Sequence, residues 1–364
     1  MGVKQLSDKY IREKKAENED DIRTLLETRR TQIRVVGCGG GGGNTVTRLS
    51  HAGLDGAVTI ALNTDAMDLL NTEADKKLVI GKQLTQGLGA GANPTVGMES
   101  ARESKEEIKK LLEGADLVFI TAGMGGGTGT GSAPVVAEIA KKIGALTVAV
   151  VTLPFAMEGR GRMNNAKDGL KNLESNVDTM IVIPNEKLLE IVPDVSIATA
   201  FKVADEILVN AVKGLTELIT KPGLVNLDFA DVRTIMKDGG IAMIGMGESS
   251  SENRAFESVE RALNNPLLTV DINGATGALI HVIGGPQITL KQAQQIAETV
   301  TSKLSADAKI IWGVQVDKSF GDNIRTMVVV TGAKSSEIPW EKSPAEKQKK
   351  KDIEKILGID SIDR

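Results

Sequence analysis

The stretch GGGTGTG, from Gly125 to Gly131, decides the fold that this sequence predicts. It follows a buried-strand pattern, DLVFITAG at 116–123, and directly precedes a helical pattern, SAPVVAEIAKKI at 132–143. A loop with so few side chains lets several backbone N–H groups converge on an anion beside a helix N-terminus. A flexible linker is the alternative, but linkers seldom sit tightly between a strand and a helix. The stretch therefore predicts a phosphate-binding loop.

This loop differs from the common P-loop, which reads G-x-x-x-x-G-K-[ST] and places its lysine on the outer phosphates. Here no lysine follows the glycines, and Thr128 and Thr130 supply the hydroxyl groups instead. We therefore expect the phosphate charge to be neutralised by backbone amides, by the helix dipole and by a bound cation.

A second glycine run strengthens the prediction of phosphate binding. The sequence TQIRVVGCGGGGGNTVTRL, residues 31–49, reads as a short β-branched strand, a run from Gly37 to Gly43, and a helix opened by Asn44. The run contains G-x-G-x-x-G, a weak signal that nicotinamide-dependent oxidoreductases share. Their fingerprint also needs an acidic residue about 20 positions on, and Asp65 comes somewhat late. Two phosphate loops suit a nucleoside di- or triphosphate better than one dinucleotide.

Further motifs make the chain resemble FtsZ, the prokaryotic branch of the tubulin family, in its archaeal form. GGGTGTG is the signature of tubulin and FtsZ, and the other motifs follow in the family's order over roughly residues 31–335. The resemblance implies a GTPase that binds GTP or GDP, polymerises head to tail into filaments, and works at the division site. These other motifs are GCGGGGGN (37–44), LNTD (62–65), GLGAGANPTVG (87–97), LPFAMEGRGRM (153–163), PNEKL (184–188) and NLDFADVRTIM (226–236).

Composition agrees with a cytoplasmic protein of about two domains, because 364 residues exceed the usual single core. A net charge of −4 gives no electrostatic argument for nucleic acid, and aromatic residues, at 2%, are too scarce to stack on single strands. The lone Cys38 excludes an intramolecular disulfide and fits a reducing compartment. The longest apolar stretch, 146–157, is interrupted by Pro154 and is too short to span a bilayer.

The predicted fold is α/β, with a Rossmann-like parallel-sheet GTPase domain joined by a long central helix to a smaller α+β domain, as in the tubulin/FtsZ fold. β-branched strands alternate with helical stretches from Ile33 to Pro184. The central helix is apolar on most sides, so we expect it between two domains. Capping boxes at Ser249-x-x-Glu252 and Thr289-x-x-Gln292 predict the starts of two later helices. The expected segments are a charged extension at 1–30, a GTP-binding domain at 31–197, the central helix at 198–221, an α+β domain with the catalytic loop at 222–335, and a flexible tail at 336–364.

The chemistry that glycine loops cannot supply is predicted in NLDFADVRTIM, residues 226–236. Hydrolysis of a phosphoanhydride needs a positioned water and a group that orients or polarises it. Asp228 and Asp231 lie three residues apart and would project from one face of a helical turn. Spacing alone favours Asp228 as the N-cap of a helix that starts at Phe229. The resemblance instead implies that the two aspartates, with Asn226, activate the attacking water.

The resemblance also places Asp205 on the guanine edge, where a carboxylate accepts from N1–H and the exocyclic amino group together. At about 1.5 Å per residue, the helix from Asp205 to Thr220 is about 22 Å long, and Asp228 lies beyond its end. One subunit is therefore not expected to place Asp205 and Asp228 on the same nucleotide. We expect Asp228 and Asp231 to act on the nucleotide of the next subunit, through a head-to-tail contact that builds filaments.

The resemblance implies the remaining nucleotide contacts, and some have a plainer alternative. Phe201 would stack on the base, although aromatic residues on buried helices are usually core. Glu158 and Arg162 would hold the ribose and the base edge, or form a solvated charge pair. Asn44 and Asn185 would contact the base or ribose, or cap helices. The residues expected to hold the phosphates are Gly39, Gly40, Gly41, Gly125, Gly126, Gly127, Thr128, Gly129, Thr130 and Gly131, with Ala90, Gly91, Ala92 and Asn93 around the γ-phosphate.

The expected cation is Mg²⁺, which would bridge the outer phosphates, but no carboxylate in the phosphate loops marks a protein ligand for it. Cys38 is expected to serve packing, with a pKa lowered by the nearby helix N-terminus as the alternative. His51 and His281 have no partners at metal-ligand spacing, so we interpret both as structural.

The sequence therefore predicts a self-assembling GTPase of cell division that is active in the polymer. Three rivals are a nicotinamide-dependent oxidoreductase, a nucleotide-binding scaffold without hydrolysis, and a shape-determining or other tubulin-like paralogue without a division role. In the tail, Ile353, Ile356 and Leu357 fall at helical spacing, which predicts a docking peptide for a membrane-tethering adaptor. The alternatives are a disordered solubilising tail and direct contact of Lys349 to Lys351 with anionic lipid.

Overall fold

The computed structural model describes residues 31–191, 196–221, 223–225, 228–265 and 275–332 of the chain. The predictions for the extension at 1–30, for Asn226 and for the tail at 336–364 lie outside these residues. Among the described helices, none has the length and apolarity that crossing a bilayer requires.

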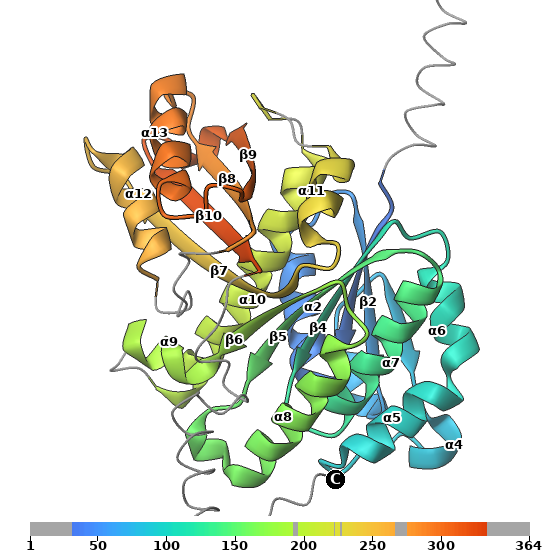
Figure 1. Ribbon diagram of the computed structural model, residues 1–364. Coiled ribbons are helices and arrows are strands. Elements are labelled where there is room, and N and C mark those ends of the chain that lie inside the picture. The colour runs from blue at the N-terminus through green and yellow to red at the C-terminus, as the bar shows by residue number, and fades with distance from the viewer. Residues whose placement is uncertain (1–30, 192–195, 222, 226–227, 266–274, 333–364) are drawn as a thin grey trace, which may run out of the picture.

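Ten strands of the described chain form one sheet, in the order β3-β2-β1-β4-β5-β6-β7-β10-β8-β9 (Figure 1). Strands β1 to β6 pair in parallel, whereas β10 pairs antiparallel with β7 and β8, and β9 is added parallel to β8. The predicted parallel sheet and the predicted α+β portion are both confirmed. The strands are β1 Ile33–Cys38, β2 Ala57–Asn63, β3 Lys76–Val79, β4 Leu117–Gly123, β5 Leu146–Leu153, β6 Thr179–Pro184, β7 Gly240–Ser249, β8 Gly277–Gly284, β9 Lys309–Val316 and β10 Ile324–Thr331.

Helices cover both faces of the parallel part, because side chains on both faces of its strands are buried. In β1, Val35 and Val36 point to opposite faces, yet neither is exposed to solvent. The helices are α2 Gly39–Ala52, α3 Ala66–Asn71, α4 Lys82–Thr85, α5 Pro94–Glu103, α6 Lys105–Leu112, α7 Thr128–Lys142, α8 Arg160–Glu174, α9 Asn185–Ile191, α10 Ile197–Thr220, α11 Phe229–Met236, α12 Arg254–Leu263 and α13 Leu290–Thr301, with the 3₁₀ turns η1 Ala156–Glu158 and η2 Lys318–Phe320.

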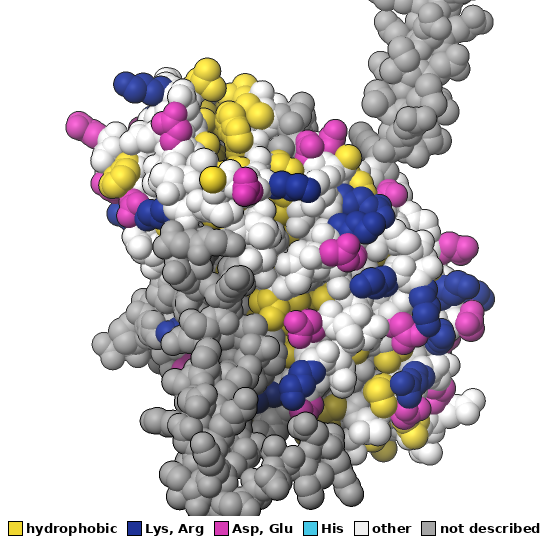
Figure 2. Space-filling view, viewed as in Figure 1, with side chains coloured by type: hydrophobic (Ala, Val, Ile, Leu, Met, Phe, Trp, Pro, Cys, Tyr) yellow, Lys and Arg dark blue, Asp and Glu magenta, His cyan; other side chains and the backbone are white. Residues whose placement is uncertain are grey.

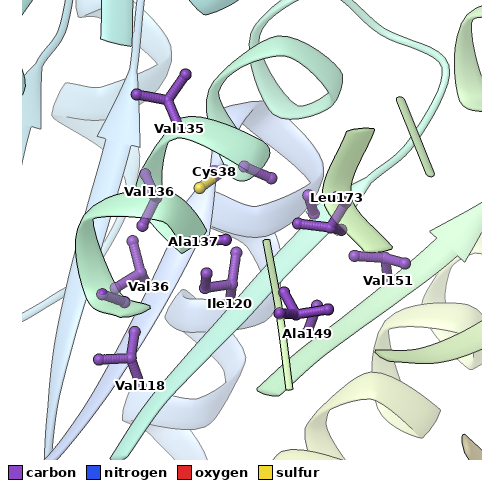
Figure 3. Close-up of a cluster of buried hydrophobic side chains, with 14 of the residues drawn as sticks. Val36, Cys38, Val118, Ile120, Val135, Val136, Ala137, Ala149, Val151 and Leu173 are labelled. Atoms are coloured by element: carbon purple, nitrogen blue, oxygen red, sulfur yellow. The ribbon is translucent and has the colours of Figure 1, made fainter. Parts of the chain in front are cut away.

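One hydrophobic cluster fills the space between the sheet and α7 and α8. Figure 3 shows Val36 of β1 and Ile120 of β4 beside Val136 of α7, with Leu173 of α8 in the same cluster. All of these side chains are fully buried. Burial of a side chain of this size stabilises the fold by about 1.5–3 kcal/mol relative to exposure. This cluster fixes α7, and with it the glycine loop that precedes α7.

Helix α10 links the two parts of the sheet. Its buried Leu208 and Leu215 belong to a second cluster, which also holds Val150 of β5 and Val329 of β10. The predicted central helix at 198–221 is therefore confirmed to within a residue at each end. The sheet itself is continuous between the two parts, through parallel pairing of β6 with β7 over 179–181.

Two helices begin inside the glycine runs, earlier than the sequence indicates. We predicted helix starts at Asn44 and Ser132, but α2 begins at Gly39 and α7 begins at Thr128. Glycine lacks a side chain, so the first turns can approach neighbouring loops closely. The first-turn N–H groups of a helix have no intrahelical partner, so they can serve a ligand instead.

The two predicted capping boxes have different outcomes. Thr289 and Gln292 form the capping box that begins α13, as predicted. The box at Ser249 and Glu252 is wrong, because the N-cap of α12 is Asn253 and makes no side-chain cap. The Ser249 hydroxyl instead donates to Glu257 Oε2 at 2.7 Å, so a carboxylate inside the helix takes the serine.

Charged side chains of both signs are mixed on the face that Figure 2 shows. Lysine and arginine side chains alternate there with aspartate and glutamate side chains. That face has no single-sign field of the kind that attracts a nucleic-acid backbone.

Candidate functional site

A cavity of about 380 Å³ lies at the carboxyl ends of β1, β4 and β5, and α10 closes one side of it. The first six strands have the order 3-2-1-4-5-6, so the strand order reverses between β1 and β4, although these two strands are parallel. In open α/β sheets, ligands bind outside the carboxyl ends of the strands at such a switch point. The described residues that line the cavity are Cys38, Gly40, Gly41, Asn44, Gly123, Met124, Gly126, Gly127, Thr128, Gly129, Thr152, Pro154, Glu158, Arg162, Asn185, Phe201, Ala204 and Asp205.

The two glycine runs touch each other at the floor of this cavity. Gly39 has a φ of +69°, and a Cβ built on it would lie 2.7 Å from Gly129 N. Such a distance is too short for any side chain, so the contact requires glycine. The first turns of α2 and α7 are therefore adjacent, and their N–H groups are available to one anion between them.

A third loop packs against the signature loop from outside. A Cβ built on Gly127 would lie 2.8 Å from Ala90 Cβ and 2.8 Å from Asn93 N. Asn93 also caps α5, since its side chain accepts from Thr95 N at 3.0 Å. The residues expected around the γ-phosphate, 90–93, thus lie next to the signature loop but do not line the cavity.

The two signature threonines are hydrogen-bonded within the protein. Thr128 Oγ1 lies 2.6 Å from Thr64 Oγ1, which ties the signature loop to the LNTD motif. Thr130 Oγ1 accepts from Gly125 N at 2.8 Å and so closes the loop on itself. Thr130 and Gly131 do not line the cavity, because Gly131 packs against Pro94 O of α5. Of the signature loop, Gly126, Gly127, Thr128 and Gly129 line the cavity, whereas the Thr130 hydroxyl does not.

The opposite wall presents an aromatic ring and polar groups. Phe201 is 40% exposed, lines the cavity, and meets Phe155 edge to face at 5.1 Å between ring centroids. This exposure differs from the ordinary core packing that we weighed for Phe201. Asn185 is buried, and its Oδ1 has no hydrogen-bond partner among the described residues. A buried amide oxygen of this kind needs a donor, which a ligand in the cavity would supply.

Glu158 and Arg162 form an ion pair, and both also line the cavity. The predicted charge pair is therefore present, and contact of these residues with a ribose or base stays a prediction. The carboxylate of Glu158 additionally accepts from Phe155 N at 2.9 Å, which fixes its position at the end of β5. The Arg162 side chain is 51% exposed, against 14% for Glu158. The exposed Arg162 side chain can therefore turn toward a ligand, whereas the Glu158 carboxylate is held by the Phe155 N–H.

Asp205 projects from α10 into the cavity and forms an ion pair with Arg48 of α2, at 3.3 Å from Oδ2 to Nε. Burial raises the pKa of Asp205 above its usual value, and the charge and hydrogen bond of Arg48 lower it. Sequence reasoning missed Arg48. The available signal was its spacing four residues from Asn44, which puts both on one face of α2.

Asn165 of α8 is a second residue that the sequence did not single out. Its side-chain amide donates to Ala92 O at 3.2 Å and to Gly125 O at 3.4 Å. It thereby joins the loop at 90–93 to the signature loop. No motif in the sequence marks this asparagine.

Two earlier expectations about single residues are settled by burial. Cys38 ends β1 and is fully buried, and burial raises the pKa of its thiol to about 12. The alternative of a lowered pKa is therefore wrong, and packing is confirmed. Asn44 lines the cavity as the sixth residue of α2, so it is not a helix cap.

The acidic pair lies outside the cavity. Asp228 is the N-cap of α11, with Oδ1 accepting from Asp231 N at 2.8 Å, as spacing alone predicted. Both aspartates are exposed, and neither lines the cavity. Helix α10 has 24 residues, so it is about 36 Å long. Asp205 lies near its beginning, whereas α11 follows its end (Figure 1).

The described chain contains no group of three or more His, Cys, Asp and Glu side chains that could hold a metal ion. The carboxylates nearest to the glycine loops serve structure. Asp65 caps α3 through Met67 N and Asp68 N, and Asp68 accepts from Asn63 Nδ2 at 2.6 Å. A cation at this site would therefore take most of its ligands from the bound anion and from water, as Mg²⁺ often does.

Comparison with known proteins agrees with this geometry. Residues 32–193 match the GTPase domain of the Tubulin/FtsZ family, and residues 240–334 match the C-terminal domain of the FtsZ family. The chain belongs to the tubulin/FtsZ family. Its GTPase domain carries both glycine loops and the loop at 90–93. The acidic pair falls between the two matched regions.

Individual relatives and a solved structure support this membership in the FtsZ family. Cell division protein FtsZ 1 of Methanocaldococcus jannaschii is 60% identical over 315 residues, covering 86% of this chain and 86% of that protein. The protein of the same name from Thermococcus kodakarensis is 62% identical over 317 residues, covering 87% and 85%. A solved dimer of M. jannaschii FtsZ matches with a TM-score of 0.83 and 60% identity, covering 86% of this chain and 92% of that one.

Proposed function

We propose that this FtsZ-family GTPase binds GTP in the cavity between the glycine loops and α10. Hydrolysis to GDP and phosphate then occurs where a second copy brings Asp228 and Asp231, with Asn226, to that cavity. The first turns of α2 and α7 hold the phosphates. Phe201 stacks on the base, and Asp205 accepts from its guanine edge. Asn44, Asn185, Glu158 and Arg162 contact the base and ribose.

A single observation carries the proposal. The cavity has amides for phosphate, a ring for the base and a carboxylate for its edge, but neither acidic residue of the NLDFADVRTIM motif lines it. A subunit alone therefore binds nucleotide without the groups that activate water. A head-to-tail contact completes the site, and repetition of that contact makes a filament.

The loop at 90–93 would respond to the γ-phosphate. The loop packs against Gly127, and the Asn165 side chain joins it to Gly125. If the signature loop moves when the outer phosphate is lost, the loop at 90–93 would therefore move with it. Mg²⁺ enters with the phosphates, because the described residues offer no protein cage for it. Its role would be to neutralise charge on the outer phosphates.

The cellular role that we propose is division in the cytoplasm. The relatives named above are cell division proteins at about 60% identity. The C-terminal peptide around 353–357 would connect the filament to a membrane-tethering adaptor, although it lies outside the described residues. Self-association is the partner interaction on which the GTPase activity depends.

The nucleotide assignment is tested by equilibrium binding of GTP and ATP to Asp205→Ala. Leaving the guanine donors unpaired costs about 1–3 kcal/mol, so GTP should bind about 5–150-fold more weakly and the preference over ATP should shrink. Asp168→Ala is the matched control, because Asp168 lines a different cavity and should bind GTP like the parent protein. Unchanged GTP affinity and preference in Asp205→Ala would contradict the assignment.

A further inference from the structure

The ion pair between Arg48 and Asp205 lies in the wall of the proposed nucleotide cavity. Asp205 lines the cavity and Arg48 does not, although Arg48 lies one turn along α2 from the cavity-lining Asn44. The Nε to Oδ2 distance is 3.3 Å, and the side chains are 33% and 19% exposed for Arg48 and Asp205 respectively. Arg48 therefore acts on a bound base only through Asp205.

Two influences favour the neutral form of Asp205, and Arg48 opposes both. Burial raises the pKa of Asp205, and the neighbouring charge of Glu206 on α10 raises it further. The guanidinium of Arg48 lowers that pKa by its charge and by its hydrogen bond. Across the cavity, the charged groups Glu158 and Arg162 pair with each other. Arg48, from the packed helix α2, is thus the cation that favours the carboxylate.

The protonation state of Asp205 decides from which hydrogen-bond donors of the base its carboxyl group can accept. A carboxylate offers only acceptors, whereas the neutral acid offers one donor and one acceptor. Guanine presents two donors on this edge, N1–H and the 2-amino group. Hypoxanthine presents N1–H alone. Only the ionised form therefore gains an interaction from the 2-amino group.

We propose that Arg48 is a specificity-determining positioning residue, which holds Asp205 ionised and oriented so that the cavity prefers guanine over hypoxanthine. The proposal rests on the role of Asp205 proposed above. It assigns no contact between Arg48 and the nucleotide. Its consequence is a preference for GTP over ITP that depends on the positive charge at position 48.

The test compares GTP and ITP affinities by titration calorimetry at two pH values, one at about pH 8 and one at the lowest pH at which the parent protein stays folded and binds GTP, because burial raises the pKa of Asp205. Arg48→Met removes the charge and keeps much of the stem. Arg48→Lys keeps the charge. Arg48→Gln repeats the loss of charge with a polar side chain. Arg102→Gln is the control, because Arg102 pairs with Glu99 at an exposed site on α5.

In Arg48→Met and Arg48→Gln, the ratio of GTP to ITP affinity should fall about tenfold at the lower pH, the scale of an unpaired buried donor. The ratio should recover at the higher pH, where Asp205 ionises without help. Arg48→Lys and Arg102→Gln should keep the parent ratio. Thermal melting confirms that each variant is folded.

Two outcomes would overturn the inference, and they are distinguishable. If neutral variants at position 48 keep the parent ratio at both pH values while Asp205→Ala lowers it, Arg48 has no role in specificity and the role of Asp205 stands. If Asp205→Ala also keeps the parent ratio, the base-reading role in the proposed function fails together with the inference.

Discussion

The two ends of α10 differ in how completely one chain builds them. At the first end, the two glycine loops, the end of β5 and the helix enclose a cavity. A Cβ built on Gly39 would lie only 2.7 Å from Gly129 N, so the contact at its floor requires glycine. At the other end, Asp228 and Asp231 are exposed on the first turn of α11. The nucleotide end is preorganised by burial, whereas the acidic end presents its groups to solvent.

This difference is what the proposed function requires, since one subunit would bind the nucleotide and the next would supply Asp228 and Asp231. A binding site must exclude water and fix its donors, and the core cluster beneath α7 supplies that rigidity. Groups that activate water can stay exposed at the surface, because they are needed only when another molecule brings a phosphate to them. Under the proposed function, hydrolysis would thereby be restricted to the assembled state.

The largest effect is expected from Asp231→Ala, which should bind GTP normally and lose turnover by about 100-fold or more, the contribution of a positioned general base. Mixing it with Asp205→Ala should restore activity. In the mixture, an intact cavity on one subunit meets intact aspartates on the other. Steady-state phosphate release measures this. A mixture whose rate is only the sum of the two variants would contradict a site shared between subunits.

Asp228 allows its two roles to be separated. Asn caps helices as well as Asp, whereas Ala at an N-cap costs about 0.5–2 kcal/mol. Asp228→Asn should therefore have the same free energy of unfolding as the parent protein and still lose most turnover. Asp228→Ala should lose most turnover and also have a lower free energy of unfolding. Denaturant unfolding and phosphate release are measured on the same samples. Full turnover in Asp228→Asn would reduce Asp228 to a helix cap.

The acidic end of α10 should also respond to pH through His281, which lines a cavity with Glu217 and Lys221 near the end of that helix. Burial lowers the pKa of His281 from 6.5 to about 4. Between these two pH values the unfolded chain binds more protons than the folded chain, so protonation favours unfolding. The contribution of the neutral, buried His281 to the free energy of unfolding is therefore fully present above pH 6.5 and is lost as the pH falls toward about 4. The expected loss is about 3 kcal/mol.

Urea unfolding of the parent protein and of His281→Gln over this pH range measures the effect of His281. The variant should lose less stability than the parent as the pH falls. His51→Gln is the control, because His51 is exposed and pairs with Glu73 at 2.8 Å. Equal pH dependence in the parent and in His281→Gln would refute the assignment.

A smaller effect is expected at the nucleotide end from Thr130→Val. The substitution removes the acceptor for the buried Gly125 N–H, which costs about 1–2 kcal/mol. Part of that loss should appear as weaker GTP binding, because the signature loop is no longer closed on itself. Thr130→Ser retains the hydroxyl and should behave like the parent. GTP affinity in Thr130→Val equal to that of Thr130→Ser would show that the loop does not depend on this bond.

The sequence predicted features that depend on neighbours along the chain. The glycine loops, the parallel strands and the Asp228 cap follow from local residue order, and the structure contains them. The helix starts at Gly39 and Thr128 were missed, because glycine gives no helical signal of its own. The capping box at Ser249 failed since Glu257, one turn into α12, binds the serine instead.

Pairings between distant segments could not be predicted. Arg48 and Asp205 meet only because α2 and α10 pack together on one face of the sheet. Asn165 reaches Ala92 and Gly125 in the same way, across three segments of the chain. Neither residue lies in a motif, and its chemistry depends on a partner that local patterns do not specify.

The dependence of GTP hydrolysis on protein concentration tests the central claim most directly. If Asp228 and Asp231 act on the nucleotide of the next subunit, activity per molecule should be very low in dilute protein and rise steeply above a threshold concentration. Asp231→Ala should show no such rise. Activity per molecule that stays constant from dilute to concentrated protein would contradict the claim that two subunits share the site.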